Sequence, residues 1–277
     1  MGFKPLPAAV AVAIALIIWF AIPVPAGVTA NAWHLLALFV ATIAAIIGKA
    51  MPIGALSIVA IALVAVTGVT NATPGGAIAD ALSSFANPLI WLIGVSIMIS
   101  RGIIKTGLGA RIGYRFIAVW GKKTIGIAYS LALSELILAP VTPSNTARGG
   151  GIIHPIMRAI AGSYDSDPEH GTQGRMGRFL ALANYHANPI TSAMFITATA
   201  PNPLIVKLIA DTTGAQISLT WGTWALAMLL PGLVALALMP LVVYWLNPPE
   251  IKSTPNAAQF ARDRLREMGP VTRGELI

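Results

Sequence analysis

The sequence contains no cysteine and few charged residues. Without cysteine among its 277 residues, the chain can form neither a disulfide nor a thiolate nucleophile or metal site. Only 10% of the residues are Asp, Glu, Lys or Arg, against roughly a quarter in a soluble domain, whereas 56% are hydrophobic. This composition excludes a soluble globular fold and indicates a chain that lies in a lipid bilayer.

Motifs for metal binding, nucleotide binding and catalysis are also missing. No pair of histidines has the spacing of metal ligands, and no phosphate-binding glycine loop occurs. Ser144 could act as a protease nucleophile only with a base beside it, and His154 stands on the far side of a glycine run. We therefore expect that the chain is not an enzyme and that it binds neither a metal nor a cofactor.

Long apolar runs are what the sequence has instead. A helix that crosses about 30 Å of hydrocarbon needs about 20 apolar residues, and only helices or closed barrels satisfy their backbone groups in lipid. The runs predict an all-α integral membrane protein with about six transmembrane helices. These runs cover residues 6–24, 33–47, 53–69, 87–104, 179–200 and 219–246.

Two shorter apolar pieces, 125–140 and 152–161, are predicted to form one re-entrant hairpin that enters and leaves on the same side. Alternating the spans from a cytoplasmic N-terminus then places every basic residue except Arg148 and Lys207 on one side. Basic residues concentrate on the cytoplasmic side of membrane proteins. The net charge of +8 is thus explained by anchoring in the membrane, and we expect no nucleic-acid partner.

The tip of this hairpin is the most informative stretch. In APVTPSNTARGGG, residues 139–151, prolines interrupt the helix and glycines permit a close approach. Non-helical backbone at membrane depth is tolerated where it lines a cavity or lies within protein, so we predict a binding site for an anion at Ser144, Asn145 and Thr146. The alternative is that these residues only cap the next helix. Arg148 needs an anionic partner, which is either a substrate carboxylate or Glu135.

A second interruption occurs in TATAPNP, residues 197–203. A broken helix that points its ends at a midplane site is typical of secondary transporters, so Thr197, Thr199, Pro201 and Asn202 become candidate binding residues. The alternative is a helix that simply ends at the prolines, with threonines bonded to their own backbone.

Two amphipathic segments are predicted, one between the membrane runs and one after them. Residues 106–123 predict an interfacial helix, with a structured loop as the alternative. The last segment, 247–277, begins with the helix-stopping Asn247-Pro248-Pro249 and is predicted to be a cytoplasmic linker. Within it, Ser253 and Thr254 could cap a short helix from Pro255 that lies along the inner surface.

The motifs TPSNTAR, residues 142–148, and TATAPNP together resemble the divalent anion:sodium symporter family, especially its citrate/succinate antiporters and 2-oxoglutarate/malate translocators. The resemblance extends along the whole chain. It implies a homodimer of subunits with two inverted repeats, each with a Ser-Asn-Thr-tipped hairpin and a broken helix. Substrate would lie between the two tips and move by an elevator-like shift. Ser144, Asn145 and Thr146 would then be one of two clamps for substrate carboxylates.

The sequence departs from its sodium-coupled relatives at two positions of the cation site. The break reads Thr197-Ala198-Thr199-Ala200, with alanine where those relatives have glycine, and Arg148 replaces a small residue. A fixed guanidinium could supply the sodium charge. The resemblance thus implies exchange of di- or tricarboxylates such as citrate, succinate, 2-oxoglutarate or malate, and sodium is disfavoured as a cofactor without being excluded.

The chain contains one Ser-Asn-Thr where the resemblance implies two. We therefore expect residues 1–246 to be the transmembrane N-terminal half, with the first helix and first repeat, and 247–277 to lead toward a missing C-terminal half. The expected setting is multi-pass in a bacterial inner membrane, in contact with lipid. The open alternatives are half of a sodium-coupled dicarboxylate symporter and a membrane protein that assembles with a partner without transporting.

Overall fold

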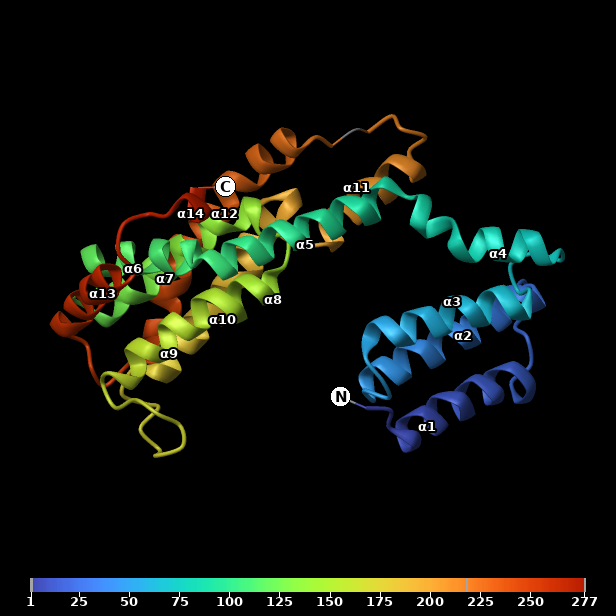
Figure 1. Ribbon diagram of the computed structural model, residues 1–277, viewed down its shortest axis with the longest axis horizontal. Helices are drawn as coiled ribbons and strands as arrows, with labels where there is room; N and C mark the ends of the chain where they lie inside the picture. The colour runs from blue at the N-terminus through green and yellow to red at the C-terminus, as the bar shows by residue number, and fades with distance from the viewer. Residues whose placement is uncertain (1, 218, 277) are drawn as a thin grey trace. The chain divides into compact units, whose positions relative to one another are not determined.

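The computed structural model describes residues 2–217 and 219–276, and these form helices joined by turns. The only β-type pairing within those residues is an isolated antiparallel bridge between Lys123 and Ser253. The chain divides into two compact units, Met1–Ile90 and Trp91–Ile277 (Figure 1). Each unit is described by itself.

The first unit consists mainly of α1 (Pro5–Leu16), α2 (Ala30–Ile47), α3 (Ile53–Thr67) and α4 (Pro74–Leu82). A π-helical turn, Ile17–Ala21, extends α1, and a 3-10 turn, Ser83–Ala86, follows α4. Its small core is built on Ala11, Ala45, Ala50 and Leu56. Most of its large apolar side chains stay exposed, as expected of helices whose solvent is lipid.

The sequence prediction missed α4, although local signals for it exist. The Thr73 hydroxyl caps this helix by accepting from the Gly76 N–H at 3.3 Å, and Pro74 occupies the first turn. Proline is well placed there because its missing N–H would have no intrahelical partner anyway. The segment lay between two predicted apolar runs, 53–69 and 87–104, and no element was predicted there.

The second unit opens with α5 (Pro88–Thr106) and α6 (Leu108–Trp120), followed by two helical arms at the place of the predicted hairpin, whose re-entrant course stays a prediction. Its first arm is α7 (Thr124–Leu138) with a 3-10 turn, Ala139–Val141. Its second arm contains α8 (Asn145–Arg148), a π-helical turn (Gly149–Ile153) and α9 (His154–Gly162). The remaining helices are α10 (Gly177–Met194), α11 (Pro201–Thr212), α12 (Trp221–Leu246), α13 (Pro255–Glu267) and α14 (Arg273–Leu276).

The core of this unit lies where α10 packs against α7 and α12. Phe179 and Leu180 of α10 are fully buried there, together with Leu131 of α7. Helices α10 and α12 approach each other closely at Gly232, where an added Cβ would lie 2.5 Å from the Met194 side chain. This packing fixes the hairpin arm and the broken helix against each other and so positions their tips.

Three helical segments of the described chain are long and apolar enough to cross a membrane: Ala30–Ile47, Thr124–Val141 and Trp221–Leu246. A fourth arises if the helices on either side of Asn87 form one span, and two further apolar helices, Pro5–Ala21 and Ile53–Thr67, are shorter. A multi-pass helical membrane protein is therefore supported, whereas the expected count of about six spans is not established. The first hairpin arm reaches spanning length because the 3-10 turn prolongs α7.

The two amphipathic segments both form helices. Over 106–123 the structure contains α6, so the loop alternative for that segment is wrong. In the tail, α13 begins at Pro255 as predicted, but it packs against α6, with Phe260 edge-on to Tyr114. The capping prediction for this helix is wrong, because the Thr254 hydroxyl donates to the Gly121 carbonyl at 2.8 Å instead.

An unpredicted contact ties the end of the tail to α6. Arg111 donates from Nε to Glu275 Oε2 at 2.8 Å and from Nη1 to the Gly269 carbonyl at 2.8 Å. Both charged side chains are almost fully buried. The hydrogen bond from Arg111 is the main reason why the pKa of Glu275 is lowered from its ordinary value. The tail thus ends in an ion pair that is shielded from water.

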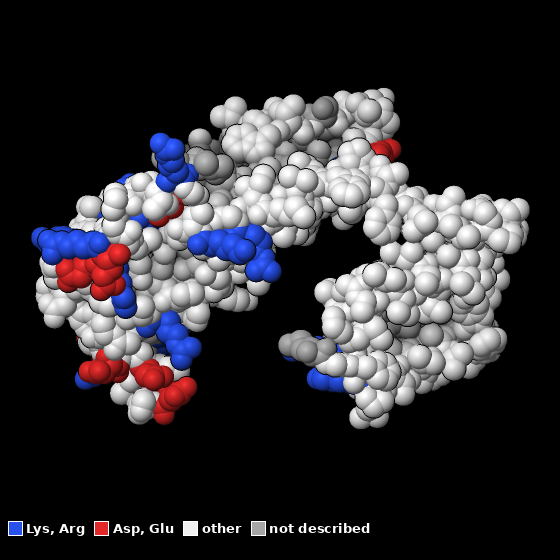
Figure 2. Space-filling view, viewed as in Figure 1, with Lys and Arg blue, Asp and Glu red and all other residues white. Residues whose placement is uncertain are grey.

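Charged side chains gather at one end of the second unit. Figure 2 shows blue and red surfaces over the end where Figure 1 draws α6, α9 and α13. Arg101 and Lys105 are exposed on the second half of α5, and the surface from there toward α11 is almost entirely uncharged. Lys207 of α11 forms an ion pair with Asp211 on its own helix. The side of the membrane that this charged end faces stays a prediction of the positive-inside pattern.

Candidate functional site

The tip of the hairpin forms where two prolines and a short capped helix replace α7. Pro140 lies in the 3-10 turn, and the chain then runs extended to Ser144, the N-cap of α8. The Ser144 hydroxyl accepts from the Ala147 N–H at 3.2 Å, and Asn145 Oδ1 accepts from the Thr146 N–H at 2.8 Å. The capping role that the sequence left open for this motif is therefore present. The side chain of Asn145 stays half-buried and that of Thr146 exposed.

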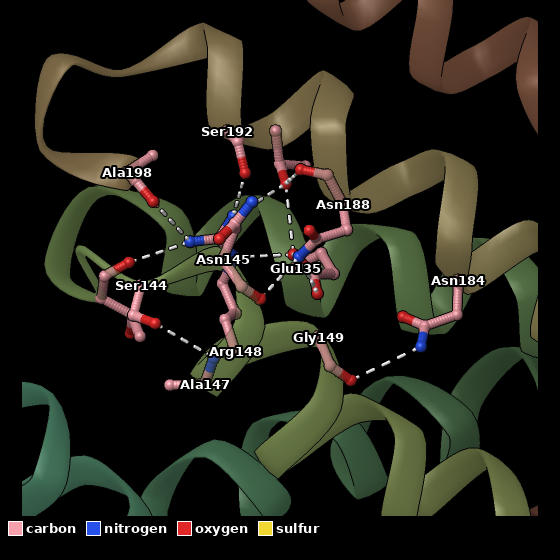
Figure 3. Close-up of polar contacts among 12 residues, drawn as sticks. Glu135, Ser144, Asn145, Ala147, Arg148, Gly149, Asn184, Asn188, Ser192 and Ala198 are labelled. Carbon is pink, nitrogen blue, oxygen red and sulfur yellow. Dashed lines mark hydrogen bonds and ion pairs between the residues drawn. The ribbon is translucent and has the colours of Figure 1, made fainter. Parts of the chain in front are cut away.

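Arg148 lies directly behind this tip and is completely buried. Its Nε donates to Glu135 Oε2 at 2.6 Å. Its Nη1 donates to two backbone carbonyls, Thr142 O at 2.9 Å and Ala198 O at 3.2 Å, and its Nη2 to Ser192 Oγ at 2.8 Å and, more weakly, Thr191 Oγ1 at 3.4 Å (Figure 3). An arginine has five N–H donors, one on Nε and two on each terminal nitrogen, so every donor has an acceptor within the protein.

Glu135 is equally buried and has further partners besides the guanidinium. Asn188 Nδ2 donates to its two oxygens at 3.2 and 3.3 Å, and Thr191 Oγ1 donates at 3.1 Å. The same Asn188 amide also donates to the Asn145 carbonyl at 3.0 Å. An isolated buried charge would cost several kcal/mol, and these hydrogen bonds together with the ion pair compensate for that cost.

The predicted helix break lies between α10 and α11. Helix α10 ends at Met194, a 3-10 turn covers Ile196–Ala198, and α11 starts at Pro201. Thr197 Oγ1 donates to the Pro140 carbonyl at 2.6 Å, so this break is bonded to the hairpin's first break. Thr199 is extended and partly buried between them. The interpretation as a broken helix is therefore preferred to a helix that only ends at the prolines.

Asn202 stabilises this break internally. Its amide donates to the carbonyls of Ser192 at 2.8 Å, in the last turn of α10, and Phe195 at 2.9 Å, the residue that follows α10. The side chain is largely buried. Its role in the structure is thus to complete the backbone hydrogen bonding of the break.

A groove of about 640 Å³ opens on the other side of the tip, between the hairpin's second arm and α10. Asn145, Thr146 and Gly150 line it from the hairpin, and Asn184 and Tyr185 from α10. Asn184 is nine-tenths buried, and its Oδ1 has no hydrogen-bond partner within the described part of the chain. A pocket of this size with a few polar groups is typical of a small-molecule site.

The structure brings the predicted residues together in two groups. Asn145 and Thr146 line the open groove beside Ser144, whereas Arg148, Thr197 and Asn202 make contacts within the protein. For Arg148, the structure shows the Glu135 pair that the sequence had left as the alternative to a substrate carboxylate. Pro201 is exposed at the start of α11.

The sequence analysis did not single out the polar face of α10. Asn184, Asn188 and Thr191 follow one another at spacings of four and three residues, so they lie on one side of the helix, the side that faces the hairpin. The spacing was visible in the sequence as a signal. The proline-containing break that follows α10 was the stronger signal in this part of the sequence.

Apolar helices, a hairpin with an interrupted tip and a broken helix bonded to it are features of a membrane transporter. The model of the family described as "Sodium:sulfate symporter transmembrane region" matches residues 4–277, and the chain belongs to this family of divalent anion:sodium symporters. Its members are transporters and not enzymes, in agreement with the expectation from the sequence.

Curated relatives agree with this assignment. The chain is 52% identical over 273 residues to "Putative malate transporter YflS" of Bacillus subtilis, which covers 99% of the chain and 55% of the relative. It is 42% identical over 276 residues to the chloroplastic dicarboxylate transporter 1 of Arabidopsis thaliana, covering 100% and 48%. It is 40% identical over 250 residues to the inner membrane protein YbhI of Escherichia coli, covering 90% and 51%. The chain thus spans about half the length of these relatives.

Proposed function

We propose that this chain is the N-terminal half of a transporter that exchanges organic dicarboxylates, with Ser144, Asn145 and Thr146 as one carboxylate clamp. The relatives include a putative malate transporter and a chloroplastic dicarboxylate transporter, which supports this class of substrate. Tricarboxylates such as citrate remain within the proposal. A second clamp would come from the missing C-terminal half, and two such subunits would form the homodimer.

The proposal rests on the guanidinium of Arg148, whose N–H groups all donate to acceptors within the protein. Carbonyl oxygens from both breaks, Thr142 O and Ala198 O, converge on its Nη1. Backbone carbonyls at interrupted helices are the groups with which transporters of this kind coordinate a sodium ion. In this chain two such carbonyls accept from the guanidinium of Arg148, a permanent cation, and this supports exchange without sodium.

In this proposal Arg148 positions the tip and does not touch substrate. With Glu135 it forms a pair of zero net charge, and none of its N–H groups remains free. The substrate carboxylate would instead meet the Thr146 hydroxyl and the Asn145 amide at the open groove. Thr197, Thr199, Pro201 and Asn202 then shape the second break behind the clamp.

The proposed setting is a bacterial inner membrane with the N-terminus in the cytoplasm. The gathering of charged side chains at one end of the second unit supports the orientation for that unit (Figure 2). The hairpin of residues 125–161 would be re-entrant from that side, and residues 247–277 would lead toward the other half along the cytoplasmic surface.

Counterflow in proteoliposomes tests the transport activity. The chain is reconstituted together with the remaining half of its polypeptide, loaded with labelled succinate, and exposed outside to malate, succinate, citrate or sulfate. We expect exchange with organic dicarboxylates in choline buffer. An absence of exchange with all four anions would instead favour a membrane protein that only assembles with a partner.

Sodium coupling is the second candidate function, because the description of the family names sodium. The same vesicles distinguish it, since exchange that appears only when sodium replaces choline would contradict our reading of Arg148.

The clamp is tested separately with Thr146→Val. Loss of a hydrogen bond to a charged carboxylate should raise the half-saturating substrate concentration roughly 10- to 100-fold. Thr212→Val is the matched control, because the hydroxyl of this exposed threonine bonds to its own helix at Leu208 O. Equal effects of the two substitutions would remove Thr146 from the binding site.

A further inference from the structure

A second groove, separate from the groove beside the hairpin tip, lies along α7. It has a volume of about 680 Å³ and runs between α7 and α12, closed at one end by the last turn of α6. Its walls are apolar side chains such as Leu133, Leu136 and Leu233. Two lysines, Lys122 and Lys123, line its α6 end. We call it the lysine-capped groove.

The length of the lysine-capped groove matches one leaflet of a bilayer. Along α7 its lining extends from Ile125 to Leu136. With a rise of 1.5 Å per residue, these 11 steps cover roughly 17 Å. One leaflet contributes about half of the 30 Å hydrocarbon thickness, so the groove has the depth that an acyl chain needs when its headgroup lies at the lysines.

The two lysines carry charge that the chain leaves uncompensated. Both side chains are exposed, and within residues 2–217 and 219–276 neither ammonium forms a salt bridge. Trp120 lines the same end of the groove. Tryptophan and lysine at this position are typical of the level of lipid headgroups.

The backbone beneath these lysines is fixed by the segment that follows α12. The Lys122 carbonyl accepts from the Thr254 N–H at 2.8 Å, and the Thr124 N–H donates to the Lys252 carbonyl at 3.1 Å. Further into the groove, the Tyr129 hydroxyl donates to the Ala237 carbonyl at 2.6 Å and joins its two walls. The charged end and the apolar walls are therefore held in a constant relation.

We propose that the lysine-capped groove binds an anionic phospholipid, with one acyl chain between α7 and α12 and the phosphate at Lys122 and Lys123. Basic pockets between transmembrane helices at the cytoplasmic surface recognise such headgroups. The proposal is independent of transport, because it uses neither the hairpin tip nor the helix break.

Photolabelling tests the proposal. The chain, together with the remaining half of its polypeptide, is placed in phosphatidylcholine nanodiscs. The nanodiscs contain a small fraction of a lipid with a photoreactive acyl chain, either phosphatidylglycerol or phosphatidylcholine, and labelled peptides are mapped by mass spectrometry. We expect phosphatidylglycerol to label residues 119–136 and 233–237 at least tenfold more strongly than phosphatidylcholine, since each basic residue contributes several-fold to binding.

Two variants and a control separate charge from shape. Lys122→Gln with Lys123→Gln should reduce phosphatidylglycerol labelling to the phosphatidylcholine level, whereas Arg101→Gln with Lys105→Gln, an equal loss of charge from exposed positions on α5, should not. Ala237→Trp fills the exposed wall of α12 and should reduce labelling by both probes. Circular dichroism and size-exclusion chromatography verify that each variant is folded.

Three results would overturn the proposal. These are equal labelling of the groove by both lipids, labelling by phosphatidylglycerol that survives the double lysine substitution in folded protein, and no labelling of the groove at all. The last result would mean that another protein surface, such as a second copy or the other half of the transporter, covers it.

Discussion

The buried pair of Glu135 and Arg148 makes the sharpest stability prediction. Removing one partner of a buried ion pair leaves an uncompensated charge and typically costs about 3–5 kcal/mol. We expect that cost from Glu135→Gln, and at least as much from Arg148→Met, because three further acceptors, Thr142 O, Ala198 O and Ser192 Oγ, also lose their donor. Unfolding by SDS, followed by circular dichroism, measures the change.

The double variant distinguishes the ion pair from mere loss of packing. When both charges are removed, no isolated charge remains, so the double variant should be at least about 2 kcal/mol more stable than the sum of the two single losses predicts. As a control, the exposed pair of Asp165 and Arg175, at 3.5 Å, should give less than about 1 kcal/mol for Asp165→Asn. If the two single losses simply add within about 0.5 kcal/mol, the two side chains are not coupled and the reasoning fails.

Two further predictions concern the hairpin and the tail. Gly149→Ala should destabilise the protein by about 1–3 kcal/mol, because its Cβ would lie 2.7 Å from Asn188 Nδ2, whereas Gly150→Ala, with no atom within 4 Å, should be nearly neutral in the same SDS titration. For the ion pair of Arg111 and Glu275, the lowered pKa of the carboxyl means that its stabilisation is present above the ordinary value of 4.5 and disappears as the pH falls through the lowered one. Amide hydrogen exchange of residues 268–276, corrected for intrinsic rates, should therefore speed up as the pH falls below the ordinary value of 4.5 and through the lowered one. Glu275→Gln should abolish this dependence, and a tail equally protected at all pH values would contradict the assignment.

The interruptions of the helices were readable from the sequence because proline and glycine act locally. Pro140 and Pro201 lie at breaks, since proline lacks the donor that a continuous helix needs. Proline alone does not decide a break, because Pro189 lies inside α10 and Pro231 and Pro240 lie inside α12. The Ser144 cap is likewise a contact over three residues. For the same reason the break between α10 and α11 was predicted within a few residues, whereas the re-entrant course of residues 125–161 stays a prediction.

The partners of charged side chains were not readable in the same way. Arg148 and Glu135 are 13 residues apart on two arms of the hairpin, and only the fold decides that they meet and exclude a substrate from the guanidinium. The pair of Arg111 and Glu275 spans 164 residues. Its acid had looked like part of a featureless tail because nothing near it in the sequence signals a partner.

The lengths of the spans were predicted less well than their existence. The run 6–24, which was predicted from hydropathy alone, extends beyond its helix, because the helical part of the structure ends at Ala21. Hydropathy also gave no hint of α4, in which a threonine and a proline outweigh the two glycines. Local capping therefore decided boundaries that average hydropathy could not.

The segment that follows α12 restricts how the second unit can change shape. The N–H groups of Glu250 and Ile251 donate to the carbonyls of Gly174 and Arg175, just before α10, while Thr254 and Lys252 are bonded to the start of α7. One short stretch of chain thus connects the bases of α7, α10 and α12 through backbone hydrogen bonds. Moving the base of one of these helices relative to the others would break these hydrogen bonds, which favours a conformational change in which the three helices move together.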